Sequence, residues 1–205
     1  MTSISPQSTA LVLLDLQTGN LDRLPEKEQL ITNATSLLAS CRKRCLTVAH
    51  VQVAFEEEDY QRLSPNNKAF FYLLSKGSAM EQGIHASLPH MRFHPNLTPL
   101  PEEIVVRKTR IGAFSTTDLY DQFQRRNITT LILAGVGTSG AVLSTVRDAC
   151  DKDYAMTVVS DACADKESMI HDFLIKYILP KTCHILTTKE FIADIEGEAG
   201  KGSEQ

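Results

Sequence analysis

The sequence lacks tryptophan, any long apolar run and any excess of basic residues. Its formal net charge is −4 over 205 residues, so a nucleic acid or an anionic membrane surface is disfavoured as the main partner. No stretch approaches the length of apolar sequence that spans a bilayer. The first ten residues have neither a basic start nor an apolar core, so we expect no signal peptide and a cytoplasmic protein.

Cysteine and clustered positive charge are also sparse. The five cysteines form an odd set without a Cys-x-x-Cys pair, at positions 41, 45, 150, 163 and 183. In a chain without an export signal we expect them to be reduced and mostly buried thiols. The longest basic cluster, residues 42–44, falls within a helical pattern and is typical of a solvated helix face.

The hydrophobic pattern alternates short apolar runs with longer amphipathic stretches. Six short runs predict buried strands, at residues 10–14, 46–55, 103–107, 130–135, 156–159 and 184–187. Helical stretches fall between and after them, at residues 28–44, 117–126, 141–151, 171–179 and 189–195. This order predicts an α/β fold, a doubly wound, mostly parallel six-stranded sheet with helices on both faces. We expect one domain, residues 1–196, and a flexible C-terminal tail, residues 197–205.

The segment at residues 56–100 interrupts this alternation. Its helix and strand signals are weak, and prolines 65, 89, 95 and 99 punctuate it. A connection of this length over an α/β sheet often shapes a pocket, so we predict a partial lid. Within it, Asn66, Asn67 and Lys68 are weaker candidates for contact with a substrate.

Ligands of doubly wound sheets bind beyond the carboxyl ends of the strands. The side chains that follow each predicted strand are therefore the candidates for a site. In strand order they are Asp15 with Gln17, then Phe55, then Lys108 with Arg110, then the turn Gly135, Val136, Gly137 and Thr138, and finally Asp161. We expect Asp161 and Asp165 to cap or brace the end of the fifth strand, while Arg110 can equally be a carboxylate ligand or a surface arginine.

Three of these segments resemble the isochorismatase-like superfamily, also called cysteine hydrolases, in the same order along nearly the whole chain. They are LVLLDLQTG, IVVRKTRIGAFSTTDL and LAGVGTSGAVLSTVRDACDKDYAMTVVSDACAD. The resemblance implies that Asp15 and Lys108 correspond to the catalytic aspartate and lysine of that superfamily. Position and resemblance together favour a functional role for the two residues over that of a structural ion pair.

The sequence departs from the superfamily's pattern at Ala141. Amidase-type members carry a nucleophilic cysteine at this position, and a methyl group cannot attack a carbonyl carbon. Cys150 lies about 13 Å further along the same predicted helix at 1.5 Å per residue, and we expect it to be a structural thiol.

The true isochorismatases of the superfamily also lack this cysteine, which implies hydrolysis of an enol ether with Asp15 as acid and Lys108 as electrostatic partner. The predicted substrate is small and carboxylated, such as isochorismate. Two alternatives stay open: a catalytically silent small-molecule-binding protein, and a thiol amidohydrolase scaffold whose nucleophile was lost or replaced at Ala141.

The resemblance also bears on the turn, on cofactors and on assembly. It implies a cis peptide bond between Val136 and Gly137, with the Gly137 and Ala141 amides forming an anion site. We expect Val136, Gly137 and Gly140 to bind the substrate. We expect no metal, because no histidine follows the second strand and prolines bracket His90 and His94. No nucleotide cofactor is implied, since GVGTSGA lacks the GxGxxG order.

Relatives commonly form dimers or tetramers, so we expect a homo-oligomer.

Overall fold

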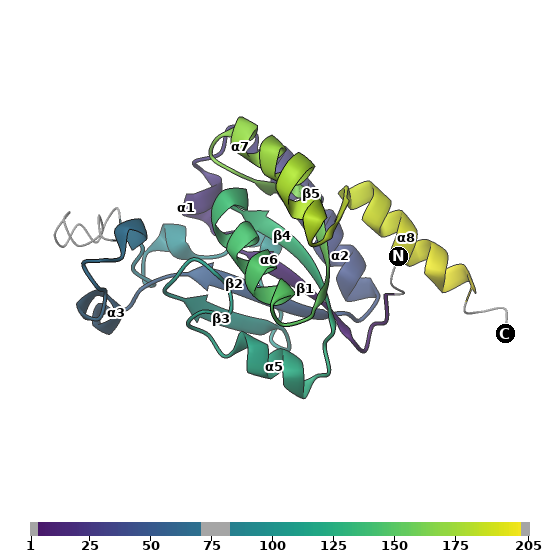
Figure 1. Cartoon of the computed structure of the whole chain (residues 1–205), viewed down its shortest axis with the longest axis horizontal. Helices are drawn as coiled ribbons and strands as arrows, with labels where there is room; N and C mark the ends of the chain where they lie inside the picture. Colours follow the sequence, from purple (N-terminus) through teal and green to yellow (C-terminus); the bar gives the residue numbers. More distant parts are fainter. Residues whose placement is uncertain (1–3, 71–82, 202–205) are drawn as a thin grey trace.

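The computed structural model describes residues 4–70 and 83–201. Its centre is a six-stranded sheet in the order β3-β2-β1-β4-β5-β6, in which every neighbouring pair is parallel (Figure 1). The predicted α/β fold is confirmed, with an all-parallel sheet. The strands are β1 Thr9–Leu14, β2 Thr47–Val53, β3 Ile104–Lys108, β4 Thr130–Val136, β5 Ala155–Ala164 and β6 His184–Leu186.

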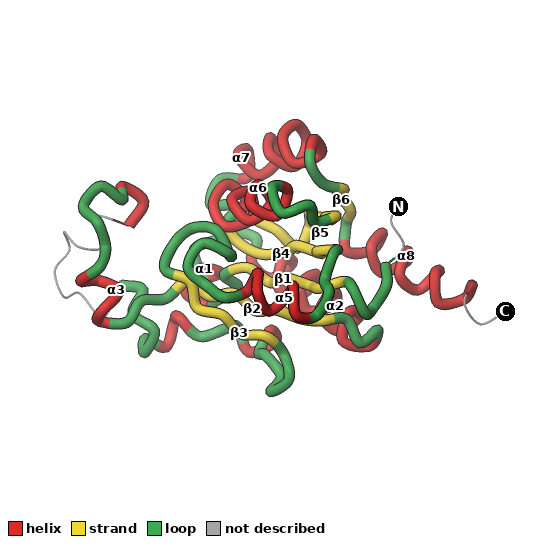
Figure 2. Tube along the Cα trace, turned by 60° about the horizontal axis from the view of Figure 1, so that its bottom comes forward, coloured by secondary structure: helices red, strands yellow, loops and turns green. Residues whose placement is uncertain are grey.

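Helices cover both faces of the sheet, and each face has its own apolar core. One face is covered by α5 Leu119–Arg125, α6 Leu143–Cys150 and α7 Ser168–Phe173, and the other by α2 Lys27–Lys43 and α8 Thr188–Lys201. The short elements are α1 Thr18–Leu21, α3 Glu57–Gln61, η2 Pro89–Met91, η3 Pro95–Leu97, η4 Thr138–Val142, η5 Leu174–Ile178 and η6 Leu179–Lys181. Figure 2 shows α3 projecting from the body on the side opposite both chain termini.

The two central strands are buried along their whole length because helices lie on both sides of them. Every residue of β1 and of β4 is buried, as their continuous apolar sequence predicts. Gly135 near the end of β4 has φ of +136°, and an added Cβ would lie 2.0 Å from the Leu14 carbonyl oxygen. Glycine is therefore required where β4 lies closest to the end of β1.

The predicted ends of one strand and two helical stretches are wrong. Strand β5 continues to Ala164, beyond the predicted end at residue 159, with a shift of register against β4 between Leu133 and Gly135. The helical run predicted at residues 171–179 spans residues 168–181 as α7, η5 and η6. Helix α8 continues to Lys201, beyond the predicted end at residue 195, because Glu, Ala and Lys in EGEAGK sustain a helix. The flexibility of the tail remains a prediction, and residues 202–205 lie outside the described part.

The cysteines are mostly shielded from solvent, as expected. All five cysteines are free, two of them are buried and two half-buried, but Cys45 is exposed at the turn after α2. Half-buried Cys150 packs against the core of its face, in keeping with a structural thiol. Among the described helices, none has the length and apolar character needed to cross a bilayer.

Within the predicted solvated face at residues 42–44, Arg42 is partly exposed and also forms an ion pair at the end of α2. Its guanidinium donates to both carboxylate oxygens of Glu103, at 2.7 and 2.9 Å, and to the Thr98 carbonyl at 2.9 Å. His50 Nε2 lies 2.9 Å from the same carboxylate, and the Leu100 amide donates to it. Burial raises the pKa of Glu103, but these partners outweigh burial and hold the pKa at about 2.

We expect Glu103→Gln to lower the free energy of unfolding by about 2 kcal/mol at pH 7, because it removes a charged acceptor shared by several donors. The folded pKa of Glu103 is lowered, so its contribution is present above pH 4.5 and is lost as the pH falls toward about 2. Urea unfolding at several pH values measures this loss as a shrinking difference between parent and variant. Glu102→Gln, at the exposed neighbouring residue, is the control; equal destabilisation by both changes would contradict the prediction.

Candidate active site

A buried ion pair joins the ends of two strands that are not neighbours. Lys108, the last residue of β3, places its Nζ 2.8 Å from Oδ2 of Asp15, which follows β1 with φ of +55°. The two side chains are 1% and 9% exposed, and β2 lies between their strands. The ammonium also donates a hydrogen bond to the Ile111 carbonyl. The structure thus brings together the two residues that the sequence predicted as catalytic.

The Asp15 carboxyl group lies in an environment that favours its protonated form. Burial raises its pKa to about 6, even though the charge and hydrogen bond of Lys108 lower it and the neighbouring Val53 amide acts in the same direction as Lys108. Its Oδ1 is buried and has no hydrogen-bond partner among the described residues. Lys108 therefore uses Oδ2 of the carboxyl group and leaves Oδ1 without a hydrogen bond from the described protein.

Gln17 is fully buried, and its carboxamide bonds to the main chain. Nε2 donates to the carbonyls of Met91 at 2.7 Å and Val53 at 3.1 Å, and Oε1 accepts from the Val53 amide at 3.1 Å. These bonds tie the end of β2 to the segment before β3. Gln17 therefore holds the loops around Asp15 in place, and its predicted contact with a substrate stays a prediction.

Phe55 is also fully buried, at the point where the predicted lid begins. Its ring lies 5.3 Å from that of Tyr60 and 5.5 Å from that of Phe70, measured between centroids. Its amide donates to the Ile84 carbonyl, and its carbonyl accepts from the Ala86 amide. Phe55 thus anchors both described parts of the segment at residues 56–100, of which residues 71–82 lie outside the description. Contacts of Phe55, Asn66, Asn67 and Lys68 with a substrate, like the lid itself, remain predictions.

The turn after β4 leads into the helical segment η4 and α6. The peptide bond between Val136 and Gly137 is cis, as predicted. Val136 and Ala141 are buried, while Gly137 and Gly140 are partly exposed. The Gly140 amide donates to the Gly137 carbonyl at 3.1 Å, so it is used within the turn. The predicted anion site at the Gly137 and Ala141 amides is not tested by these contacts.

Asp161 and Asp165 brace the carboxyl end of β5, as the sequence predicted, although Asp161 lies within the strand and not after it. Asp161 Oδ1 accepts hydrogen bonds from the amide and the hydroxyl of Thr188, both at 2.7 Å, where α8 begins. Asp165 Oδ2 accepts from the Ser139 amide at 2.6 Å, at the start of η4. Each carboxylate lies near the carboxyl end of β5 and satisfies amide groups that a helix start leaves free.

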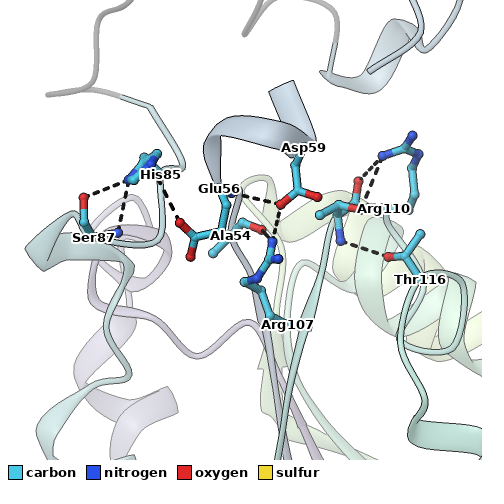
Figure 3. Close-up of polar contacts among 9 residues, drawn as sticks. Ala54, Glu56, Asp59, His85, Ser87, Arg107, Arg110 and Thr116 are labelled. Atoms are coloured by element: carbon cyan, nitrogen blue, oxygen red, sulfur yellow. Dashed lines mark hydrogen bonds and ion pairs between the residues drawn. The ribbon is translucent and has the colours of Figure 1, made fainter. Parts of the chain in front are cut away.

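Two arginines at the end of β3 have different surroundings (Figure 3). Arg107 forms an ion pair with Asp59 of α3 and donates to the Ala54 carbonyl at 2.9 Å, so it fastens α3 to the sheet. Among residues 4–70 and 83–201, Arg110 donates only to its neighbour Thr109, and no carboxylate there pairs with it. Arg107 was not predicted as a site residue, because nothing in its local sequence indicates a partner 48 residues away.

The two histidines considered as metal ligands lie in separate turns. His90 Nε2 bonds to the Gly83 carbonyl at 3.0 Å, and His94 Nδ1 accepts from the Asn96 amide at 3.3 Å. Within residues 4–70 and 83–201, no three His, Cys, Asp or Glu side chains are grouped so that they could hold a metal ion. The absence of a metal remains an expectation.

Residues 9–190 match the Isochorismatase domain, which is nearly all of the chain around the Asp15–Lys108 pair. The chain belongs to the isochorismatase family. The six-stranded parallel sheet and its helices are the fold of this family, as solved structures from it show.

A relative in Bacillus subtilis (strain 168), the uncharacterized isochorismatase family protein YwoC, is 30% identical over 196 residues, covering 95% of this chain and 97% of its own. An isochorismatase family protein from Burkholderia thailandensis has a similar structure, with a TM-score of 0.78, 28% identity and coverage of 95% and 98% of the two chains. A cysteine hydrolase from Pseudomonas syringae pv. phaseolicola 1448A has a TM-score of 0.81 at 19% identity, with 96% and 99% covered, and shares the fold.

The pKa of Asp15 tests the geometry of the ion pair directly. We expect Lys108→Met to raise this pKa above about 6, because it removes the cation that lowers the pKa and leaves the burial unchanged. A ¹³C NMR titration of the aspartate carboxyl groups measures the shift, with Asp15→Asn to assign the signal. Lys181→Met, at an exposed lysine, is the control. An Asp15 pKa that is equal in the two lysine variants would contradict the ion pair.

Proposed function

We propose that this family member is a hydrolase that works without a covalent intermediate, with Asp15 as the acid. The observation that carries the proposal is the buried Asp15 carboxyl group, which has a pKa of about 6 and an oxygen without a hydrogen-bond partner in the described part of the chain. Ala141 is proposed to occupy the place of the cysteine nucleophile of other members, so no side chain there can attack the substrate. The substrate class that fits is a small carboxylated enol ether such as isochorismate.

The proposed reaction begins with the proton on Asp15. The carboxyl group protonates the terminal carbon of the enol ether, and the double bond supplies the electron pair for the new C–H bond. The resulting oxocarbenium ion takes up water at its carbon and loses a proton, which restores the Asp15 carboxyl group. The hemiketal then breaks its C–O bond to the ether oxygen on the ring. Its hydroxyl group loses a proton as the carbonyl of pyruvate forms, and the leaving ether oxygen takes up a proton to become a hydroxyl of the diol. No step needs a protein nucleophile.

Lys108 has two opposing effects in this scheme. As the ion-pair partner of Asp15 it lowers the pKa of the acid, which limits the protonated fraction to about a tenth at pH 7 for a pKa of about 6. A substrate carboxylate that engages the ammonium draws it away from Asp15 and favours the protonated acid. Arg110, whose guanidinium has no described carboxylate partner, is a second candidate cation for such a substrate.

The alternative is an amidohydrolase scaffold that lost its thiol and now binds a small molecule. The relatives support both chemistries: ureidoacrylate amidohydrolase RutB of Cronobacter sakazakii and a probable isochorismatase of Pseudomonas chlororaphis are each 26% identical to this chain. The burial of both Asp15 and Lys108 favours the hydrolase, because a silent binding protein has no need of a buried acid.

We expect the parent protein to release pyruvate from isochorismate and Asp15→Asn to lose at least about 100-fold in kcat/KM, the usual scale for an acid catalyst. Because the folded pKa of Asp15 is raised to about 6, kcat/KM of the parent is expected to rise as the pH falls through about 6 and then to level off. Asp121→Asn, at an exposed aspartate on α5, is the matched control and should leave activity unchanged.

The comparison with Ala141→Cys separates the two chemistries. No pyruvate from the parent, together with amide hydrolysis gained by Ala141→Cys, would favour the amidohydrolase scaffold over the proposed reaction. Parent activity that rises with pH through about 6 would also overturn the proposal, since Asp15 would then act as a base.

A further inference from the structure

A cavity of about 350 Å³ lies at the amino ends of β2 and β3. Its lining includes Thr47, the first residue of β2, and Ile104, the first residue of β3. β3 is an edge strand, and α2 and α5 cover opposite faces of the sheet (Figure 1). Small-molecule sites usually have volumes of about 300–1,000 Å³, so this cavity is large enough for a small ligand.

The proposed reaction does not account for this cavity. Lys108 lies at the opposite end of β3, and a rise of about 3.3 Å per residue places it about 13 Å from Ile104. Ligands of parallel α/β sheets ordinarily bind at the carboxyl ends of the strands, where Asp15 and Lys108 meet. A ligand in the cavity would therefore occupy a second site.

One part of the cavity wall is aliphatic. Leu46, Val48 and Ile104 line the cavity and are otherwise buried in the protein core. Leu100 lines the same cavity and is 42% exposed. An exposed leucine beside core side chains gives the cavity an apolar surface, and an aliphatic group of a ligand would remove that surface from water.

Two of the charged side chains in the lining neutralise each other, and two others are unpaired. Arg42 and Glu103 form an ion pair at 2.7 Å. Arg126 is exposed and donates to the Gln122 carbonyl at 3.1 Å, and it has no ion-pair partner in the described part of the chain. Glu102 is also exposed and has no ion-pair partner among the same residues. The lining therefore offers a ligand one cation and one anion.

We propose that this cavity binds a small zwitterion with an aliphatic body, as found in an aliphatic amino acid or a dipeptide of such residues. The Arg126 guanidinium binds the carboxylate, the Glu102 carboxylate binds the ammonium, and the apolar wall covers the aliphatic side chain. A simple anion is disfavoured by Glu102 and a simple cation by Arg126, so a zwitterion fits the charges best. Because both charged side chains are exposed, each contributes little, and the expected Kd is about 1 mM. This site does not depend on the proposed hydrolysis.

The exposed thiol of Cys45 reports whether the cavity is occupied, because Cys45 lines it. For a Kd of about 1 mM, we expect about 5 mM leucine to slow the alkylation of Cys45 by N-ethylmaleimide about sixfold. Mass spectrometry of the peptide that contains each cysteine measures the rates. The half-buried Cys150 does not line the cavity and is the internal control, so its rate should stay unchanged. Glycine lacks the aliphatic group and should bind at least about fivefold more weakly than leucine.

Leucine analogues, paired with variants of the protein, test each charge separately. N-acetylleucine lacks the ammonium and leucinamide lacks the carboxylate, so each should bind the parent about fivefold more weakly than leucine does. Arg126→Met should weaken the binding of leucine about fivefold without weakening that of leucinamide. Glu102→Gln should weaken the binding of leucine without weakening that of N-acetylleucine. Arg125→Met, at an exposed arginine that does not line the cavity, is the control and should bind leucine as the parent does.

Leucylleucine distinguishes the two sources of a zwitterion. Tighter binding than that of leucine assigns the site to short peptides, and equal or weaker binding assigns it to a free amino acid. The proposal is overturned if neither compound slows the alkylation of Cys45 at up to about 20 mM, twenty times the expected Kd. Equal protection by glycine and leucine, or binding of leucine that is unchanged in both Arg126→Met and Glu102→Gln, would also overturn it. Alkylation requires no turnover, so failure of the proposed hydrolysis leaves this test intact.

Discussion

The site depends on one buried ion pair, that of Asp15 and Lys108, which spans the end of β2. Burying two charges costs several kcal/mol each, and well-packed apolar residues in their place are often as stable or more so. A gain in stability therefore does not explain why this ion pair is buried. Its geometry also constrains the sheet: β1, β2 and β3 must end at the same level, and Gly135 must let β4 approach the end of β1.

Most polar side chains around the ion pair form hydrogen bonds that hold the ends of the strands in place. Gln17 bonds the end of β2 to Met91, Arg107 bonds the same strand end to α3, and Asp165 bonds the start of η4. A side chain whose hydrogen bonds are used in this way has little left for a ligand. By contrast, Oδ1 of Asp15 has no hydrogen-bond partner among the described residues, and the guanidinium of Arg110 bonds there only to Thr109. The proposed reaction relies on these two groups and on the Lys108 ammonium.

Sequence predicted those features that depend on local pattern. The continuous apolar runs place the six strands, and the rule that ligands bind at strand ends places Asp15 and Lys108 together. Features that depend on distant partners were not predictable in this way. Arg42 has the sequence context of a solvated helix face, and its ion pair with Glu103, 61 residues away, has no signal in that local pattern. The end of α8 was predicted too early for another reason. Glycine and charged residues lowered the helical signal after residue 195 without preventing the helix.

A raised pKa by itself suits two opposite roles, because a carboxyl group near pH 6 can give a proton or accept one. In a thiol hydrolase the aspartate accepts the proton of the cysteine, and catalysis then runs through the sulfur. Residue 141 is an alanine buried at the start of the helical segment after β4, so it has no proton to give. If Asp15 takes part in a reaction, the proton that it transfers must therefore go to the substrate or to water, and a substrate that becomes reactive on protonation is the one that this site suits.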